Sequence, residues 1–201
     1  MTVDALLPLS FLKAVRSVDA PDDDPDAEFV PELRNKRLGL SETVYLQIQR
    51  YSEAVKRNQR TVHDEVVALA TLLGRRPDAE AVFREAGRFL AREAYDTVPA
   101  SFRRLLHALP AFVARPLAQR RANKIASRYL NGVVRRVGTY LVLEVPSPVT
   151  LDSVAREKGC SFYEACLREL LTLLVNANGS VEHVRCSTRG EGTCEWRAEW
   201  R

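Results

Sequence analysis

Four cysteines and one histidine near the C-terminus are the residues whose types and spacing best fit a chemical role. They are Cys160, Cys166, His183, Cys186 and Cys194. Thiolate sulfur and imidazole nitrogen are ligands that zinc prefers, and three thiolates with one imidazole complete a tetrahedral site that leaves no position for water. The set Cys160, His183, Cys186 and Cys194 therefore predicts a closed, structural zinc site.

The last two cysteines lie on either side of a turn expected at Gly190. In a hairpin symmetric about that glycine, Cys186 and Cys194 are cross-strand neighbours with Cβ atoms about 5 Å apart, close enough to share a metal. His183 precedes Cys186 by three residues, so on a regular strand its side chain points to the opposite face. It joins the site only through a bulge or a bent strand, and Glu182 is the substitute ligand if the register differs.

The other two cysteines belong to a helix that precedes the hairpin. Cys160 begins this helix and is the natural remaining ligand, whereas Cys166 fits a buried small hydrophobe. The alternative is that all four are packed thiols and His183 is exposed. We expect a cytoplasmic protein, because no run of about 20 apolar residues could span a bilayer and no basic segment precedes the first apolar patch. Disulfides are not expected in that compartment.

The elements that must position these residues follow from hydrophobic periodicity. Helices are expected over 5–17, from Ser41 to 73, from Asp78 to 98, over 102–109 and over 117–129, with one helix or two about Asn58 in the second range. Residues 133–145 predict a strand or a hairpin about Gly138. The whole is an α+β fold, in which N-terminal helices pack on an antiparallel sheet and a helix is followed by a C-terminal β-hairpin.

Composition divides the chain near residue 38. The 201 residues are 46% hydrophobic and 28% charged, as is ordinary for a globular domain. The run from Asp19 to Pro31 is rich in aspartate and proline and predicts a linker. We therefore expect a short helix and acidic linker over 1–37 and a compact ligand-binding domain over 38–201.

A basic stretch lies between Asp96 and Glu144, where the sequence has no acidic residue, although the net charge is only +4. Arg120, Lys124 and Arg128 share a face of the predicted helix there, and with Arg121 of the neighbouring face they form a predicted basic surface. Such a surface could meet phosphate, an acidic protein, nucleic acid or an anionic membrane surface. The alternative is a solvated helix face, covered by the acidic N-terminal segment.

The segments CSFYEACLRELLTLL and VEHVRCSTRGEGTCEWRAEW resemble the C-terminal part of the 4-vinyl reductase domain family. That family's pattern is a helix that starts with Cys and an aromatic residue, then a final strand pair with Cys, Gly and Cys-aromatic. The matching positions are Cys160, Phe162, Cys186, Gly190, Cys194 and Trp196. The match covers about residues 160–200, whereas 42–159 agree only in the order of elements and 1–40 lie outside it.

The resemblance implies an α+β fold shared with haem nitric-oxide-binding domains and transport-particle complex subunits, with frequent dimerisation through helices. In bacterial transcription activators that sense aromatic compounds through this domain, three cysteines and a glutamate hold zinc, and His183 stands in the place of that glutamate. Haem is not expected, because Tyr129-Leu-Asn-Gly does not supply the Tyr-x-Ser-x-Arg clamp for the propionates. Neither a glycine-rich nucleotide loop nor a redox motif is present to run vinyl reduction.

The function we expect is a zinc-stabilised, non-enzymatic module that binds or senses a hydrophobic small molecule, forms a homodimer and acts through a partner protein. The residues expected to line its pocket, with ordinary core packing as the alternative for each, are Tyr95, Phe102, His107, Tyr129 and Tyr140. Two other functions stay open. One is an enzyme or accessory protein of tetrapyrrole and bacteriochlorophyll metabolism, and the other is a basic adaptor for nucleic acid or an acidic protein.

Overall fold

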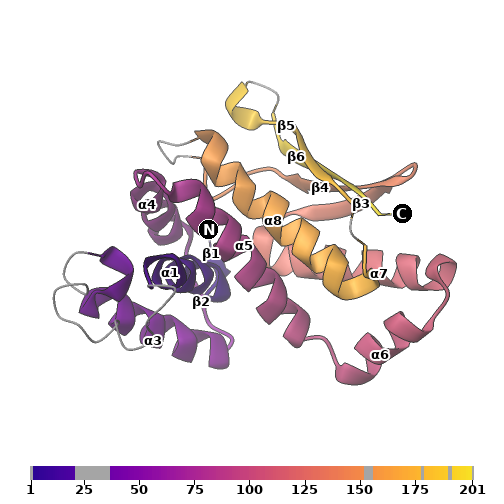
Figure 1. Cartoon of the computed structure of the whole chain (residues 1–201), viewed down its shortest axis with the longest axis horizontal. Coiled ribbons are helices and arrows are strands. Elements are labelled where there is room, and N and C mark those ends of the chain that lie inside the picture. The colour runs from indigo at the N-terminus through magenta and orange to yellow at the C-terminus, as the bar shows by residue number, and fades with distance from the viewer. Residues whose placement is uncertain (1, 21–36, 152–155, 178, 190–191, 201) are drawn as a thin grey trace.

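A four-stranded antiparallel sheet and the helices on one side of it make up the fold (Figure 1). The computed structural model describes residues 2–20, 37–151, 156–177, 179–189 and 192–200. The strands, in spatial order, are β3 (Val133–Val137), β4 (Tyr140–Val145), β6 (Cys194–Glu199) and β5 (Val181–Arg185). The predicted α+β fold is confirmed, including the last helix followed by the C-terminal strand pair.

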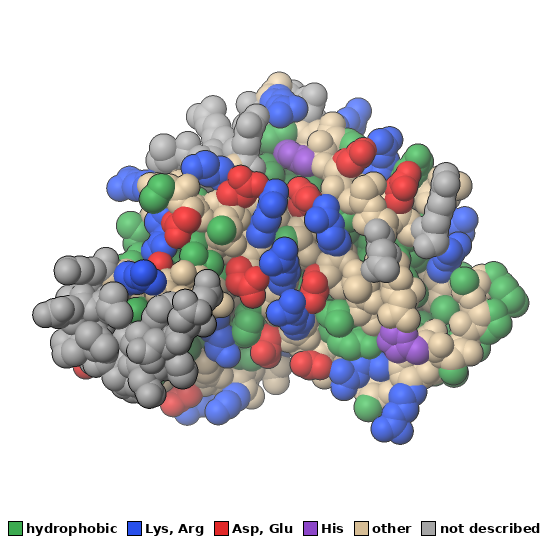
Figure 2. All heavy atoms as spheres, in the orientation of Figure 1, with side chains coloured by type: hydrophobic (Ala, Val, Ile, Leu, Met, Phe, Trp, Pro, Cys, Tyr) green, Lys and Arg blue, Asp and Glu red, His purple; other side chains and the backbone are tan. Residues whose placement is uncertain are grey.

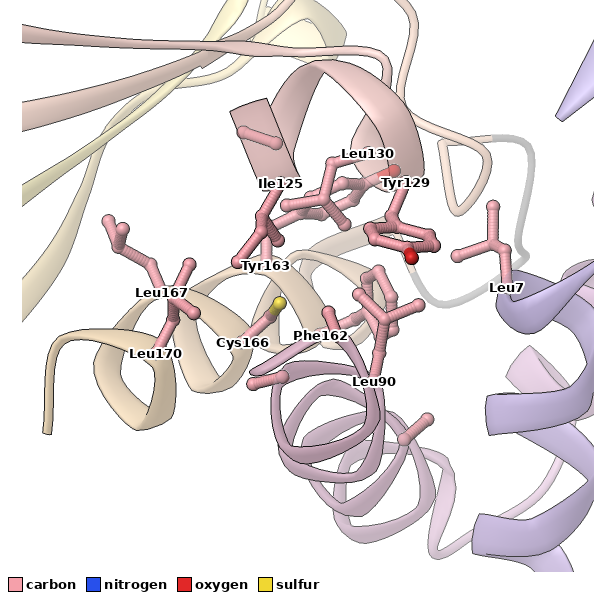
Figure 3. Packing of buried hydrophobic residues seen from close by; sticks show 14 of the residues in the cluster. Leu7, Leu90, Ile125, Tyr129, Leu130, Phe162, Tyr163, Cys166, Leu167 and Leu170 are labelled. Atoms are coloured by element: carbon pink, nitrogen blue, oxygen red, sulfur yellow. The ribbon is translucent and has the colours of Figure 1, made fainter. Parts of the chain in front are cut away.

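Helix α8 (Arg156–Val175) lies between the sheet and helix α5 (Ala79–Asp96), and it contacts both. Its buried side chains include Phe162, Tyr163 and Cys166, which belong to the single hydrophobic core. Figure 3 shows these side chains meeting residues of α5 and of the N-terminal helix in one cluster. Helix α8 therefore connects the sheet to the rest of the helical layer.

The helices before the sheet follow the predicted pattern with two differences. Ser41 caps α3 (Glu42–Lys56), since its Oγ accepts a hydrogen bond from the Val44 N–H at 3.3 Å. The positive φ of Asn58, 52°, lies in the break between α3 and the next helix, so the long range is two helices. The remaining elements of this part are the 3-10 helix η2 (Leu38–Leu40), α4 (His63–Gly74) and α6 (Ala100–Ala108).

The two differences concern Asp78 and Pro116. Asp78 occupies the N-cap position of α5, but its side chain makes no capping bond and instead accepts hydrogen bonds from Arg76 at 2.7 and 2.8 Å. Helix α7 (Ala111–Ile125) runs through Pro116, where a new helix was expected to start. The proline removes one backbone N–H and leaves the Phe112 carbonyl without its helical partner. Both residues are exposed, so water can satisfy that carbonyl.

The N-terminal helix α1 (Leu6–Asp19) begins as predicted but lies in the core. Phe11 is fully buried, with its ring centroid 5.8 Å from that of Phe83 and 5.1 Å from that of Phe162. Ahead of it, β1 (Thr2–Asp4) pairs antiparallel with β2 (Arg60–Val62), a pairing that the sequence did not predict. The division into 1–37 and 38–201 stays a prediction, but helix α1 shares one hydrophobic core with the elements after residue 38.

Charged side chains of both signs mix across the molecular face over α5 and α8 (Figure 2). Ion pairs within and between these helices include Arg92–Glu169 at 2.7 Å and Arg168–Glu164 at 2.9 Å. These pairs are exposed and each contributes little to stability, so this face is a solvated one. None of the helices in the described ranges is long and apolar enough to cross a membrane.

Helices α5 and α8 approach each other closely at Gly87. A Cβ atom built there would lie 2.2 Å from the Phe162 carbonyl oxygen and 2.9 Å from the Cys166 backbone nitrogen. Both atoms belong to the backbone of α8, so no side-chain rotation could relieve the overlap. We expect Gly87→Ala to lower the free energy of unfolding by about 3 kcal/mol, although alanine is the better helix former by about 1 kcal/mol.

Denaturant unfolding of the variant checks this expectation. Glu93→Ala is the matched control, because Glu93 is an exposed residue of the same helix and should change stability by less than about 0.5 kcal/mol. A Gly87→Ala protein as stable as the wild type would mean that the two helices are not held this close.

Candidate metal centre

Three potential metal ligands from α8 and β5 meet in one cluster. One ligand atom each of Cys160, His183 and Cys186 lies within 4.8 Å of the other two. Both cysteines are buried and His183 is half-buried. The fifth residue of α8 supplies the first of these thiols, the middle residue of β5 supplies the imidazole, and the residue directly after β5 supplies the second thiol. A cluster of this composition and spacing could hold a metal ion such as zinc.

A β-bulge in β5 places His183 and Cys186 on the same face. His183 pairs with Trp196 of β6, but the next pair is Arg185 with Glu195, so Val184 is an extra residue. The bulge reverses the alternation of side chains from that point onward. His183 and Trp196 therefore face inward, Arg185 and Glu195 form an outward ion pair at 3.5 Å, and Cys186 faces inward again. The three-residue spacing of His183 and Cys186 required a bulge or bend in the strand, and this bulge is present.

Cys194, the fourth predicted ligand, lies outside the group of three whose ligand atoms are within 4.8 Å of one another, but it interacts with Cys160. It is fully buried on β6, and the Cys160 thiol hydrogen-bonds to its sulfur. This bond is the main reason that the pKa of the Cys194 thiol is lowered and that of Cys160 is raised, with His183 and Ser187 also lowering the Cys194 pKa. Ser187 approaches this sulfur through its N–H at 3.4 Å and its hydroxyl at 3.3 Å.

The polar atoms of the cluster fit a cation. The Nε2 atom of His183 is buried and has no hydrogen-bond partner among the described residues. Such an atom is costly to bury unless it binds something, and a lone pair on imidazole nitrogen is a good zinc ligand. The His183 ring also stacks on Trp196, with centroids 4.8 Å apart and planes 14° apart, which fixes its orientation. Ser187 and Trp196 are supporting residues that the cysteine pattern alone did not identify.

Two other residues named with the site lie outside it. Glu182, the substitute ligand, faces outward and forms an ion pair with Arg197 at 2.9 Å. The bulge starts after His183, so this register brings the histidine inward and excludes the glutamate. Cys166 is fully buried in the core, and burial raises the pKa of its thiol to about 12. The interpretation of Cys166 as a small buried hydrophobe is confirmed.

The residues predicted to line a ligand pocket do not converge on one. Tyr95 and His107 hydrogen-bond to each other at 3.2 Å between α5 and α6, and Phe102 packs partly buried on the core. His107 lines a hollow of about 130 Å³, while Tyr129 lines a different one. Tyr140 is on the sheet, with Arg197 over its ring. Each contributes to local packing, which was the alternative for all five.

A larger hollow, of about 470 Å³, lies between α1, α3 and α5. Its lining residues are Lys13, Ala14, Arg16, Ser17, Ala20, Tyr45, Ile48, Glu85 and Phe89. Its volume falls in the range of about 300–1,000 Å³ that is usual for small-molecule sites. Cations lie over its two aromatic rings, Lys13 over Phe89 and Arg16 over Tyr45.

Neither the protein-family models nor the curated proteins compared with this chain give a match. The chemistry of the metal centre must therefore be inferred from its own donor atoms.

Proposed function

We propose that this protein is a zinc-stabilised module that binds a small apolar molecule and acts through a separate partner protein. The observation that carries the proposal is the convergence of Cys160, His183 and Cys186 in one cluster. Cys194, whose sulfur is bonded to the Cys160 thiol, is the fourth ligand that we propose. Bound there, zinc would hold the start of α8 against the β5–β6 pair. Four protein donors leave no position for water or substrate, so the role we infer is structural.

The chain's own residues prepare the site for such an ion. The Ser187 N–H donates a hydrogen bond that stabilises negative charge on the Cys194 sulfur, and zinc binds the thiolate form. Trp196 stacks on the His183 ring and holds it toward the sulfurs. Membership of the 4-vinyl reductase domain family, with His183 in place of its glutamate, is part of the same proposal.

The ligand site that we propose is the hollow between α1, α3 and α5. Ile48, Phe89 and the stems of the neighbouring lysine and arginine offer an apolar lining, which suits a small hydrophobic molecule. Homodimerisation and the partner protein remain predictions.

The test uses the full chain, purified without added metal or ligand. Elemental analysis should find about one zinc ion per chain, and mass spectrometry of an organic extract should find a small apolar molecule. Ile48→Gln should reduce the extracted molecule at least about tenfold and leave the zinc content unchanged. If zinc is found but no apolar molecule is extracted, the proposed metal centre is supported and the proposed ligand-binding function is rejected. If the extracted molecule is a pigment, the function in tetrapyrrole metabolism is supported instead.

A further inference from the structure

A second hollow, of about 230 Å³, lies beside the end of α7 and the turn that follows it, the π-helical turn η3 (Ala126–Leu130). Its lining residues are Thr97, Arg121, Lys124, Ile125, Arg128 and Tyr129. Three of them are cationic and none is acidic. No residue of the proposed metal centre or of the hollow between α1, α3 and α5 takes part in it.

The cations lie along one side of a continuous helical run. Arg121, Lys124 and Arg128 are three and four residues apart, a spacing that places side chains on neighbouring turns of one face. Arg120 belongs to the same predicted basic surface, but it is exposed and does not line the hollow. Of the four residues of the predicted basic surface, three therefore line the hollow and Arg120 lies outside it.

The guanidinium of Arg121 is only partly satisfied by hydrogen bonds. Its Nε atom is buried and has no hydrogen-bond partner in the part of the chain that the structure describes, and its Nη2 reaches the Thr97 carbonyl oxygen only at 3.5 Å. Within the described residues, no carboxylate pairs with Arg121 or Lys124. A buried N–H without an acceptor is unfavourable, and a charged oxygen entering the hollow would supply one.

The remaining wall is held in place by contacts of its own. Arg128 pairs with Asp4 at 3.0 Å, donates to the Asn58 side chain at 3.0 Å and stacks over the Tyr129 ring. A tyrosine hydroxyl is protonated at neutral pH, and burial raises the pKa of Tyr129 further. Asp4 offsets one of the three positive charges, and the hollow keeps a net positive charge.

We infer that this hollow binds a small free oxyanion, of the phosphate or dicarboxylate class, through Arg121, Lys124 and Tyr129. The planar fork of an arginine matches two oxygens of such an anion, and a lysine adds a point charge. The volume suits a small anion and is below the usual range for larger organic ligands. The competing explanation is that the cations only neutralise the carbonyl end of α5, but Arg121 makes only one long bond there.

The experiment is isothermal titration of the full, zinc-replete chain at low ionic strength, with inorganic phosphate in one arm and malonate in the other. We expect one site per chain for at least one of the two anions, with a dissociation constant below about 10 mM, and the tighter arm identifies the class. Lys124→Gln should weaken binding at least about tenfold. Arg121→Lys, which keeps the charge but loses the fork, should weaken it too.

Arg120→Gln is the matched control, because it removes one positive charge from the adjacent position outside the hollow. Its affinity should stay within about twofold of the wild type. Absence of binding in both arms would overturn the inference. So would an equal loss in Arg120→Gln and Lys124→Gln, because that result would show attraction to the basic surface as a whole. Circular dichroism of each variant confirms that the lost affinity is not lost folding.

Discussion

Cys160→Ser is expected to lose the zinc ion that we propose and to lower the free energy of unfolding by about 5 kcal/mol or more. Structural zinc sites contribute on the order of 10 kcal/mol to small domains that depend on them. Here a larger hydrophobic core supports the rest of the fold, so the loss should be smaller. It should remain large, because the variant leaves buried thiols and the His183 imidazole without the metal that we propose.

Thermal unfolding and elemental analysis of the same samples check this expectation. Cys166→Ala is the matched control, because it removes a buried sulfur from the same helix outside the cluster. This variant should keep its zinc, and its free energy of unfolding should fall by only about 1 kcal/mol. A strong chelator should lower the wild-type unfolding temperature and leave that of Cys160→Ser unchanged. Equal stability of Cys160→Ser and the wild type would mean that the cluster consists of packed thiols.

Phe11→Ala is expected to lower the free energy of unfolding by about 3–5 kcal/mol. The side chain is fully buried, and its ring contacts Phe83 of α5 and Phe162 of α8. Removing it leaves a cavity at the point where three helices meet, and the cost of such a cavity adds to the lost burial. Urea unfolding measured by circular dichroism should show the loss as a lower midpoint with an unchanged slope.

Phe112→Ala provides the comparison, since it removes the same side chain from a position that is 79% exposed. It should change stability by less than about 0.5 kcal/mol.

A chain that begins at residue 38 tests the predicted domain boundary by the same urea unfolding measurement. Because helix α1 contributes to the core, the shortened chain should not form a stable fold and should show no cooperative unfolding transition. Stable, cooperative folding of the shortened chain would restore the division at residue 38.

The elements that sequence predicted well are those decided by local interactions. Ser41 caps α3 through a bond to its own third neighbour, and Gly138, with φ of 61°, makes the two-residue turn between β3 and β4. What sequence missed depends on distant residues. The pairing of residues 2–4 with 60–62 has no local signal, and the burial of α1 depends on the faces that α5 and α8 leave open.

The metal centre shows the same division. The types and spacing of the residues predicted four donors, of which Cys160, His183 and Cys186 meet in one cluster, and strand alternation showed that His183 needed an irregularity. The choice between Glu182 and His183 depended on where the bulge falls, which no local pattern determines. The ligand residues were less predictable, because aromatic side chains in helices pack into cores far more often than they line pockets.

The extra residue in β5 shifts the alternation of inward and outward side chains by one position. Val184 changes the phase in which side chains alternate, so positions before and after it follow different parities. Two residues of one regular strand share a face only when their separation is even. His183 and Cys186 are an odd number of positions apart, and the phase shift is what reconciles them. When two residues along one strand direction must both face inward and are separated by an odd number of positions, the sequence therefore predicts a bulge between them.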